Sequence, residues 1–239
     1  MRLDKYLSGL GLGSRRDVKK MIKQGRVKAD GFDKLTPETS IEPGADKVYV
    51  DGKLTVYREF VYIMLNKPKG YVSATEDGRH PTVCDLAPEE FSHMKLFPVG
   101  RLDIDTEGLC VLTNDGALSH RLLSPKSHVP KTYVAELDMG ITDADVEAFK
   151  DGIVLDDGYK CKSAELEALD DKSVRIVIYE GKFHQVKRMF AAVGKTVTAL
   201  KRVKMNELCL DPGLEPGEAR ELTDRELSQL DNRRDTDGK

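Results

Sequence analysis

The sequence of 239 residues lacks three features: a long apolar run, closely spaced cysteines and histidines with the spacing of metal ligands. No apolar stretch approaches the ~20 residues that cross a bilayer, which argues against a membrane protein. The first residues, MRLDKYL, interleave charged and apolar side chains and so lack the apolar core of a secretory signal. We therefore expect a cytoplasmic protein without a membrane partner.

The cysteines and histidines give no indication of a metal site. Cys84, Cys110, Cys161 and Cys209 are scattered along the chain, and we expect buried free thiols instead of disulfides or zinc ligands. The five histidines are equally dispersed. We expect neither a structural nor a catalytic metal ion.

The net charge of −3 is distributed unevenly. Nine basic and three acidic side chains give residues 1–30 a charge of +6, which leaves −9 for residues 31–239. The basic side chains are those of Arg2, Lys5, Arg15, Arg16, Lys19, Lys20, Lys23, Arg26 and Lys28. This asymmetry indicates a basic docking module attached to a body that finds its ligand by other means.

Two short helices are predicted in the basic segment. Their apolar stripes are Leu3, Tyr6, Leu7 and Leu10 in the first and Val18, Met21 and Ile22 in the second. Ser14 and Asp17 have the spacing of a capping box at the start of the second helix. The charged face of this helix stacks Arg15, Lys19 and Lys23, which destabilises it by a few tenths of a kcal/mol per pair unless an external anion such as phosphate compensates. The alternative is a solvated basic face with no ligand.

The segment RLDKYLSGLGLGSRRDVKKMIKQGRVKADG resembles the S4-type RNA-binding domain over about the first quarter of the chain. The resemblance implies contacts to the RNA backbone, which position a protein without reading sequence. The RNA-binding residues expected here are Arg2, Lys5, Arg15, Arg16, Lys19, Lys20, Lys23 and Arg26.

A composition change near residues 56–59 predicts a boundary, with an RNA-binding domain at residues 1–58, a larger domain at 59–230 and a disordered tail at 231–239. Strands are predicted at residues 26–28, 60–65, 131–137 and 173–179, and helices at 85–94, 117–123, 141–152 and 184–193. Strands with single helices inserted between them favour an α+β fold over a doubly wound sheet.

The segment 100–116, GRLDIDTEGLCVLTNDG, holds two carboxylates inside a loop bounded by glycines and flanked by apolar residues. Partly shielded carboxylates such as Asp103 and Asp105 need a partner or a chemical role. The alternative is an Asp-rich turn between two strands, because Asp, Asn, Thr and Gly favour turns for local reasons.

Two known motifs fit this loop only in part. The EF-hand pattern accepts Asp103, Asp105 and Gly108, but it needs a glutamate at its twelfth position. That position holds Asn114. The nucleophile loop of haloacid-dehalogenase phosphatases needs Thr or Val where this chain has Glu107, and an unbroken apolar strand before the first aspartate.

A third pattern fits without exceptions. GRLDIDTEGLCVLTNDG, with LNKPKGYVSAT before it and SHRLLSPKSHVPKTYVAEL and EGKFHQVKRMFAAVGKTV after it, resembles the RsuA/Rlu group of pseudouridine synthases. Within this group, SHRLLSP and the C-terminal LDPGLEPGEARELT favour an enzyme of small-subunit (16S) ribosomal RNA. The resemblance implies a mixed, largely antiparallel sheet with RNA lying across a central cleft.

The reaction that the resemblance implies converts uridine to pseudouridine with no net change in atoms, so no cofactor is required. It needs a carboxylate at the sugar or base of a flipped-out nucleotide. Asp103 matches the essential aspartate of the family, whereas Asp105 is expected to be a structural acceptor within the loop. Lys187 matches the basic position of the family and is expected to keep Asp103 ionised.

The resemblance assigns further residues to the substrate. Tyr133 is expected to stack on the uracil and to assist late proton removal, Leu200 to pack against the base, and Arg101 to order the loop or contact RNA. The side chains expected to hold phosphates at the cleft edge are those of Lys67, Lys69, Lys201, Arg202 and Lys204. Without the resemblance, Tyr133 is equally well explained as a core residue and Lys187 as a solvated lysine.

The sequence thus predicts a monomeric enzyme that modifies ribosomal RNA, either naked or in an assembly intermediate. Two alternatives remain open: a large-subunit (23S) rRNA synthase of the same group, and a non-catalytic rRNA-binding assembly protein.

Overall fold

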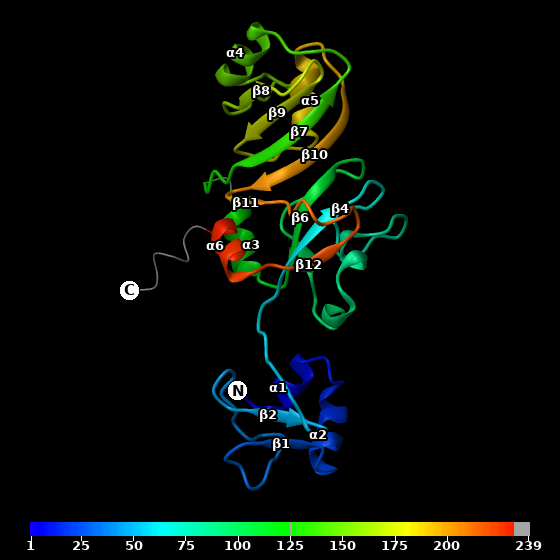
Figure 1. The fold of residues 1–239 in the computed structure, drawn as a ribbon, viewed down its shortest axis with the longest axis vertical. Coiled ribbons are helices and arrows are strands. Elements are labelled where there is room, and N and C mark those ends of the chain that lie inside the picture. Colours follow the sequence, from blue (N-terminus) through cyan, green and yellow to red (C-terminus); the bar gives the residue numbers. More distant parts are fainter. Residues whose placement is uncertain (125, 232–239) are drawn as a thin grey trace, which may run out of the picture. The chain divides into compact units, whose positions relative to one another are not determined.

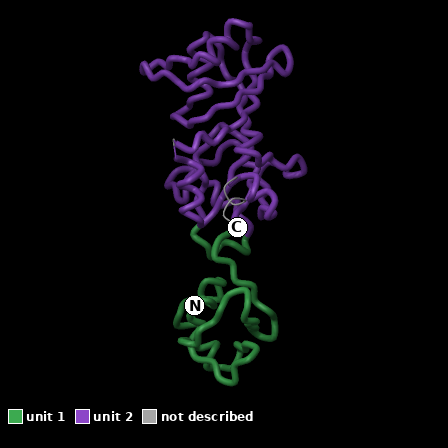
Figure 2. The backbone as a smooth tube through the Cα atoms, turned by 90° about the vertical axis from the view of Figure 1, so that its left-hand side faces the viewer, with its two compact units in different colours: residues 1–61, 89–95 green, residues 62–88, 96–239 purple. Residues whose placement is uncertain are grey.

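The computed structural model describes residues 1–124 and 126–231, which form two compact units (Figure 2). Residues 1–61 and 89–95 form the first unit, and the other described residues form the second. The chain first passes from one unit to the other between Val61 and Tyr62. The boundary predicted from the sequence lies three residues earlier, after residue 58. No helix in the described ranges is both long enough and apolar enough to span a membrane.

The first unit consists of two helices and a small antiparallel sheet (Figure 1). Its elements are α1 (Leu3–Gly9), α2 (Arg15–Lys23), β1 (Val27–Ala29), β2 (Val48–Val50) and β3 (Lys53–Leu54). Ser14 caps α2 by accepting the N–H of Asp17, whose carboxylate accepts the N–H of Ser14 in return, which confirms the predicted capping box. The apolar stripes of both helices lie in one core with Ile41 and Val48, so the basic side of α2 faces solvent.

The second unit is built on a nine-stranded mixed sheet. Its main path has the order β12-β4-β6-β10-β7-β9-β8, with β11 beside β10 and β5 beside β6. The strands are β4 (Tyr62–Lys67), β5 (Phe97–Pro98), β6 (Glu107–Thr113), β7 (Lys131–Leu137), β8 (Glu165–Ala168), β9 (Ser173–Ile178), β10 (Val197–Met205), β11 (Leu208–Cys209) and β12 (Ala219–Glu221). Among the described strands only β6 and β10 pair in parallel. The α+β fold with a largely antiparallel sheet is therefore confirmed.

The parallel junction between β6 and β10 joins the two halves of this sheet. It contains two register pairs, Glu107 with Lys201 and Gly108 with Arg202. Gly108 has a φ of +99°, and a Cβ at this position would lie 2.2 Å from the carbonyl oxygen of Arg202. Only glycine allows so close an approach, and the junction depends on it.

Four helices complete the second unit: α3 (Gly116–Leu123), α4 (Asp143–Asp151), α5 (Gln185–Ala192) and α6 (Asp224–Leu230). Helices α3 and α6 pack on β4 and β6 (Figure 1), where Leu118 and Leu227 share a core with Met64. In the other half, α4 and α5 contact each other through Phe149 and Phe190, whose ring centroids lie 4.9 Å apart. Each half of the sheet thus has its own pair of helices.

Most predicted elements are confirmed to within two residues, but the predicted helix at 85–94 is wrong. This segment forms two short 3-10 helices, η1 (Val83–Leu86) and η2 (Glu89–Phe91). Pro88 lies between them, and the residue before it, Ala87, is extended with a ψ of 145°, because a proline disfavours helical backbone at the preceding residue.

Two predictions about single residues also need comment. All four cysteines are free, and Cys110 and Cys161 are buried as expected. Cys84 is half-buried and Cys209 is exposed, contrary to the expectation of buried thiols. Asp231, the first residue of the predicted tail, is buried, and its carboxylate accepts a hydrogen bond from Arg121 at 2.6 Å. The rest of that tail, residues 232–239, lies outside the described residues.

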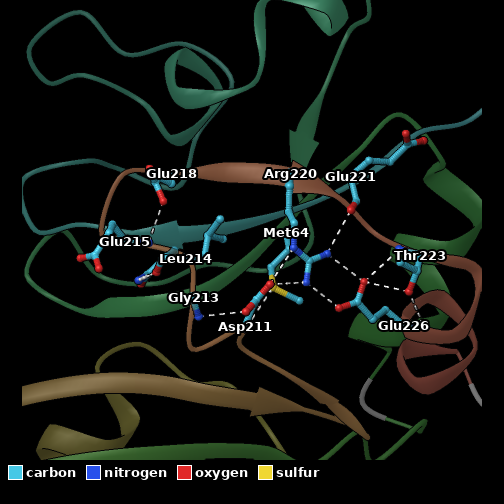
Figure 3. Close-up of polar contacts among 11 residues, drawn as sticks. Met64, Asp211, Gly213, Leu214, Glu215, Glu218, Arg220, Glu221, Thr223 and Glu226 are labelled. Carbon is cyan, nitrogen blue, oxygen red and sulfur yellow. Dashed lines mark hydrogen bonds and ion pairs between the residues drawn. The ribbon is translucent and has the colours of Figure 1, made fainter.

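The C-terminal motif LDPGLEPGEARELT forms a strap along β4, held by Arg220 (Figure 3). The guanidinium of Arg220 donates to Asp211 at 2.7 and 2.9 Å and to Glu226 at 2.7 and 2.9 Å. The hydrogen bonds from Arg220 to Glu226 lower the pKa of Glu226 to about 2. Asn66 of β4 donates to the carbonyl of Leu214 at 2.7 Å. The motif therefore closes the edge of the sheet with β12.

Candidate active site

The loop between β5 and β6 carries Asp103 and is fixed through its backbone. The N–H of Gly70 donates to the carbonyl of Ile104 at 2.8 Å. The hydroxyl of Ser73 accepts the N–H of Leu102 and donates to its carbonyl, both at 2.9 Å. The loop is thus held in one conformation by the turn that follows β4.

Lys67, the last residue of β4, holds the same loop from inside the protein. Its side chain is 0% exposed, and its ammonium donates to the carbonyl oxygens of Asp103 at 3.0 Å and Thr106 at 2.7 Å. Burial lowers the pKa of Lys67 to about 8. The predicted contact of Lys67 with an RNA phosphate is therefore wrong, because a fully buried ammonium that is bonded to carbonyl oxygens cannot reach a phosphate at a cleft edge.

Two side chains at the start of α5 face the Asp103 carboxylate. Lys187 Nζ lies 3.6 Å from Oδ2, and His184 Nε2 lies 3.6 Å from Oδ1. Lys187 also donates to Asp105 at 2.5 Å, and this hydrogen bond lowers the pKa of Asp105. The structure thus brings Lys187 to Asp103 as the sequence analysis expects, although Lys187 is closer to Asp105. Asp105 is an acceptor, but its donor comes from α5 and not from its own loop.

The carboxylate of Asp103 lines a pocket of about 490 Å³. The floor of this pocket comes from one face of β7 and β10, where Tyr133 lies opposite Arg202 in the register. Because side chains alternate along a strand, Leu200 lies on the same face. Tyr133 is 7% exposed and Leu200 is 5% exposed. An acid on a fixed loop therefore faces an aromatic and apolar floor, an arrangement that suits a flat, uncharged ring.

Arg202 also lines this pocket, but it is almost fully buried. It is 1% exposed, its Nε donates to the carbonyl of Leu109 at 2.7 Å, and its Nη2 has no hydrogen-bond partner. The predicted phosphate contact of Arg202 at the cleft edge is wrong for the same reason as that of Lys67: its guanidinium does not reach the surface. Its position beside the parallel junction makes it part of the support for the pocket.

The other predicted cations of this unit lie in different places. Arg101 is exposed and lines the pocket. Lys69 is half exposed and lies 3.6 Å from Glu107. Lys201 precedes Arg202 on β10 and lies on the opposite face of the strand. Lys204 donates to Glu207 at 2.8 Å. These lysines and arginines therefore do not form one phosphate-binding row.

The first unit gathers its cations on α2. Arg15, Arg16, Lys19, Lys20 and Lys23 are exposed and line one shallow hollow, and this set is called the α2 basic face below. Lys5 is also exposed.

Two of the predicted RNA-binding arginines of the first unit are engaged within the protein. Arg2 donates to Asp4 and to Glu38, each at 3.0 Å. Arg26 donates to Asp51 at 2.8 Å. Their charge is partly compensated by these direct ion pairs before any ligand binds.

Ser73, Phe183 and His184 are among the residues at the site that sequence reasoning did not identify. The sequence offers a signal for His184, because it precedes Lys187 by three residues and so lies one helical turn away from it. Nothing comparable exists for Ser73, whose contact with Leu102 spans 29 residues.

Comparisons with known proteins match both units. A model of the RNA pseudouridylate synthase family matches residues 61–192, and a model of the S4 domain matches residues 1–31. An uncharacterised RNA pseudouridine synthase of Bacillus subtilis is 49% identical over 234 residues, covering 96% of this chain and 98% of its own. The ribosomal small subunit pseudouridine synthase A of Escherichia coli (strain K12) is 41% identical over 232 residues, covering 96% and 100%.

A solved structure agrees with these matches. A crystal structure described as a pseudouridylate synthase has a TM-score of 0.68 and 40% sequence identity, covering 96% of this chain and 99% of that chain. The matches fall on the segments whose motifs carry the two resemblances found in the sequence, and both resemblances are confirmed.

Proposed function

Because the chain belongs to the RNA pseudouridylate synthase family, we propose that it converts one uridine of small-subunit ribosomal RNA to pseudouridine. The observation that carries this proposal is the Asp103 carboxylate on its fixed loop, facing the floor of Tyr133 and Leu200. The choice of small-subunit RNA rests on relatives such as the Escherichia coli enzyme.

The proposed reaction uses the chain's own side chains alone. The bond from C1′ to N1 of the uracil breaks while Asp103 either bonds to C1′ or stabilises the positive charge on the ribose. The uracil turns and its C5 bonds to C1′, which releases the Asp103 carboxylate where it had bonded there. The proton of C5 then leaves and N1 takes up a proton. The atoms of uridine and pseudouridine are the same, so the reaction balances without a redox or group-transfer partner.

The neighbours of Asp103 have proposed roles that follow from their positions. Lys187 stabilises the negative charge of Asp103 across 3.6 Å in a shielded pocket. Tyr133 stacks on the flipped uracil and assists loss of the C5 proton, and Leu200 packs against the ring. An aromatic surface lowers the free energy of flipping a base by about 1 to 3 kcal/mol.

The α2 basic face is proposed to hold RNA phosphates. Its exposed cations lie within the segment that matches the S4 domain, which supports this role. We further propose that the chain acts as a monomer in the cytoplasm, where ribosomal RNA and its assembly intermediates are found.

Mapping pseudouridine in ribosomal RNA from cells with and without this protein tests the proposal. We expect one site in small-subunit RNA to disappear and to return when the wild-type chain is supplied. The Asp103→Asn chain should fail to restore it, with a loss of at least ~10³-fold in turnover and nearly unchanged RNA affinity. A lost site in large-subunit RNA would redirect the proposal to that substrate, and full turnover by Asp103→Asn would refute the mechanism.

A further inference from the structure

Phe183 and His184 form a stacked aromatic pair on the wall of the pocket that holds Asp103. Their ring centroids lie 3.7 Å apart with an interplanar angle of 20°. Phe183 is 68% exposed, more than any other large apolar side chain in the described part of the chain. Because His184 covers one face of the phenylalanine ring, the exposed area belongs to the other face and the edge.

The folding of α5 does not account for this pair. His184 occupies the N-cap position of the helix, but its side chain makes no capping hydrogen bond. Its backbone is left-handed, with a φ of +49°, a conformation shared by Asp51, His128 and Asn206 in the described part of the chain.

The pair adjoins the catalytic acid through its histidine. His184 Nε2 lies 3.6 Å from Asp103, and the Phe183 ring stacks on the face of the imidazole. Tyr133 and Leu200 already provide a floor for the flipped uracil. The open face of Phe183 is therefore a second flat surface, separate from that floor but beside the same acid.

The charges that line the pocket favour a nucleotide over an uncharged aromatic ligand. Arg101, Lys162 and Lys182 line it and outnumber its two carboxylates, those of Asp103 and Glu180. Lys182 Nζ lies 4.5 Å from the ring centroid of Tyr159. An aromatic face near several cations suits a ligand that combines a flat ring with a negative charge, which describes a nucleotide of single-stranded RNA.

We propose that the open face of Phe183 stacks on the base of the nucleotide directly next to the flipped uridine, so that the pocket holds two nucleotides. This inference rests on the proposed function for the identity of the flipped base. Stacking accepts any base, because each has a flat π-face, so Phe183 supplies affinity and orientation without reading sequence. The Phe183 ring also replaces the stacking partner that the neighbouring base loses when the uridine flips out.

The test uses ribonucleotide pentamers with one central uridine, 2-aminopurine directly 5′ or directly 3′ of it, and cytidine elsewhere. Stacking on an aromatic side chain quenches 2-aminopurine fluorescence. The full-length wild-type chain should quench the probe at one of these two positions. Phe183→Leu, which keeps an apolar side chain but removes the ring, should abolish the quenching and weaken binding about 10-fold. Phe183→Tyr should retain both.

The control is Phe60→Leu, the same change at an exposed phenylalanine that does not line the pocket. It should bind and quench as the wild type does. Phe183→Ser provides a second ring deletion if the leucine variant unfolds, and thermal melts check both. Unchanged quenching and affinity in a folded variant without the ring would overturn the inference, as would wild-type protein that quenches neither probe.

The fluorescence test and the mapping of ribosomal RNA can fail separately. Fluorescence quenching needs no isomerisation, and the mapping needs no stacking on Phe183. If the mapping fails while quenching still depends on Phe183, the base-stacking surface stands and the reaction does not. If the mapping succeeds and quenching ignores Phe183, only the stacking surface is wrong.

Discussion

The two units of the chain use the same kind of side chain in opposite ways. In the first unit the α2 basic face is exposed and lines a hollow on the surface. In the second unit Lys67 and Arg202 are 0% and 1% exposed and donate to backbone carbonyl oxygens. One set of cations is available to an external anion, whereas the other holds together the loop and the strands around Asp103.

This difference shows that burial, and not residue type, decides what a cation does. A buried ammonium must find acceptors within the protein, because a lone buried charge is very unfavourable. Lys67 finds them in the carbonyls of the Asp103 loop, so its charge is used for positioning. The side chains of α2 remain hydrated and keep their charge for phosphates.

The sharpest test of the comparison replaces Lys67 by methionine. This removes the ammonium donor from the carbonyl of Thr106 and one of the two donors of the Asp103 carbonyl, which keeps only the N–H of Thr106. The loop should therefore shift, and the free energy of unfolding should fall by about 2 kcal/mol. A displacement of about 1 Å at the acid is expected to reduce turnover about 100-fold. Chemical denaturation and a pseudouridine assay measure the two effects.

Lys69→Met is the matched control, since Lys69 belongs to the same NKPKG motif but is half exposed. It should leave the stability unchanged. If both variants melt alike, Lys67 does not have the positioning role that its contacts indicate.

The second test concerns the exposed cations. Replacing Arg15, Lys19 and Lys23 together by glutamine should lower RNA affinity at low salt about 10- to 100-fold and reduce the slope of log affinity against log salt by about 2 to 3. Stability should not fall, because three stacked like charges are removed. The control, Lys150, Lys160 and Lys172 to glutamine, removes the same charge from exposed positions of the second unit. Equal salt slopes for wild type and both variants would contradict the phosphate role.

Local patterns in the sequence account for much of this fold. The alternation in KTYVAEL predicts β7 with both of its ends. Ser14 and Asp17 predict the start of α2 in the same way. These features depend on residues a few positions apart, where periodicity and capping rules apply directly.

Contacts between distant segments account for what the sequence did not reveal. Lys67 resembles a surface lysine in the linear sequence, and only its contact with a carbonyl 36 residues away shows its burial. Lys187 and Asp105 are 82 residues apart, so no spacing rule predicts their hydrogen bond. The parallel junction at Gly108 likewise depends on how closely β10 approaches.

The smallest expected effect compares one ion pair from each unit. Glu226, bonded to Arg220 in the second unit, has a pKa of about 2 in place of 4.5, so its contribution to stability is complete above about pH 4.5 and is lost as the pH falls toward 2. Glu226→Gln should therefore lower the free energy of unfolding by about 1 kcal/mol at neutral pH, because the network is partly screened by solvent, and the difference from wild type should vanish in acid. Asp51→Asn removes the exposed partner of Arg26 in the first unit and should have no measurable effect. Urea titrations at pH 7 and pH 2.5 measure the free energy of unfolding of both variants. If Glu226→Gln and Asp51→Asn lose the same free energy, burial does not distinguish the ion pair of Arg220 from that of Arg26.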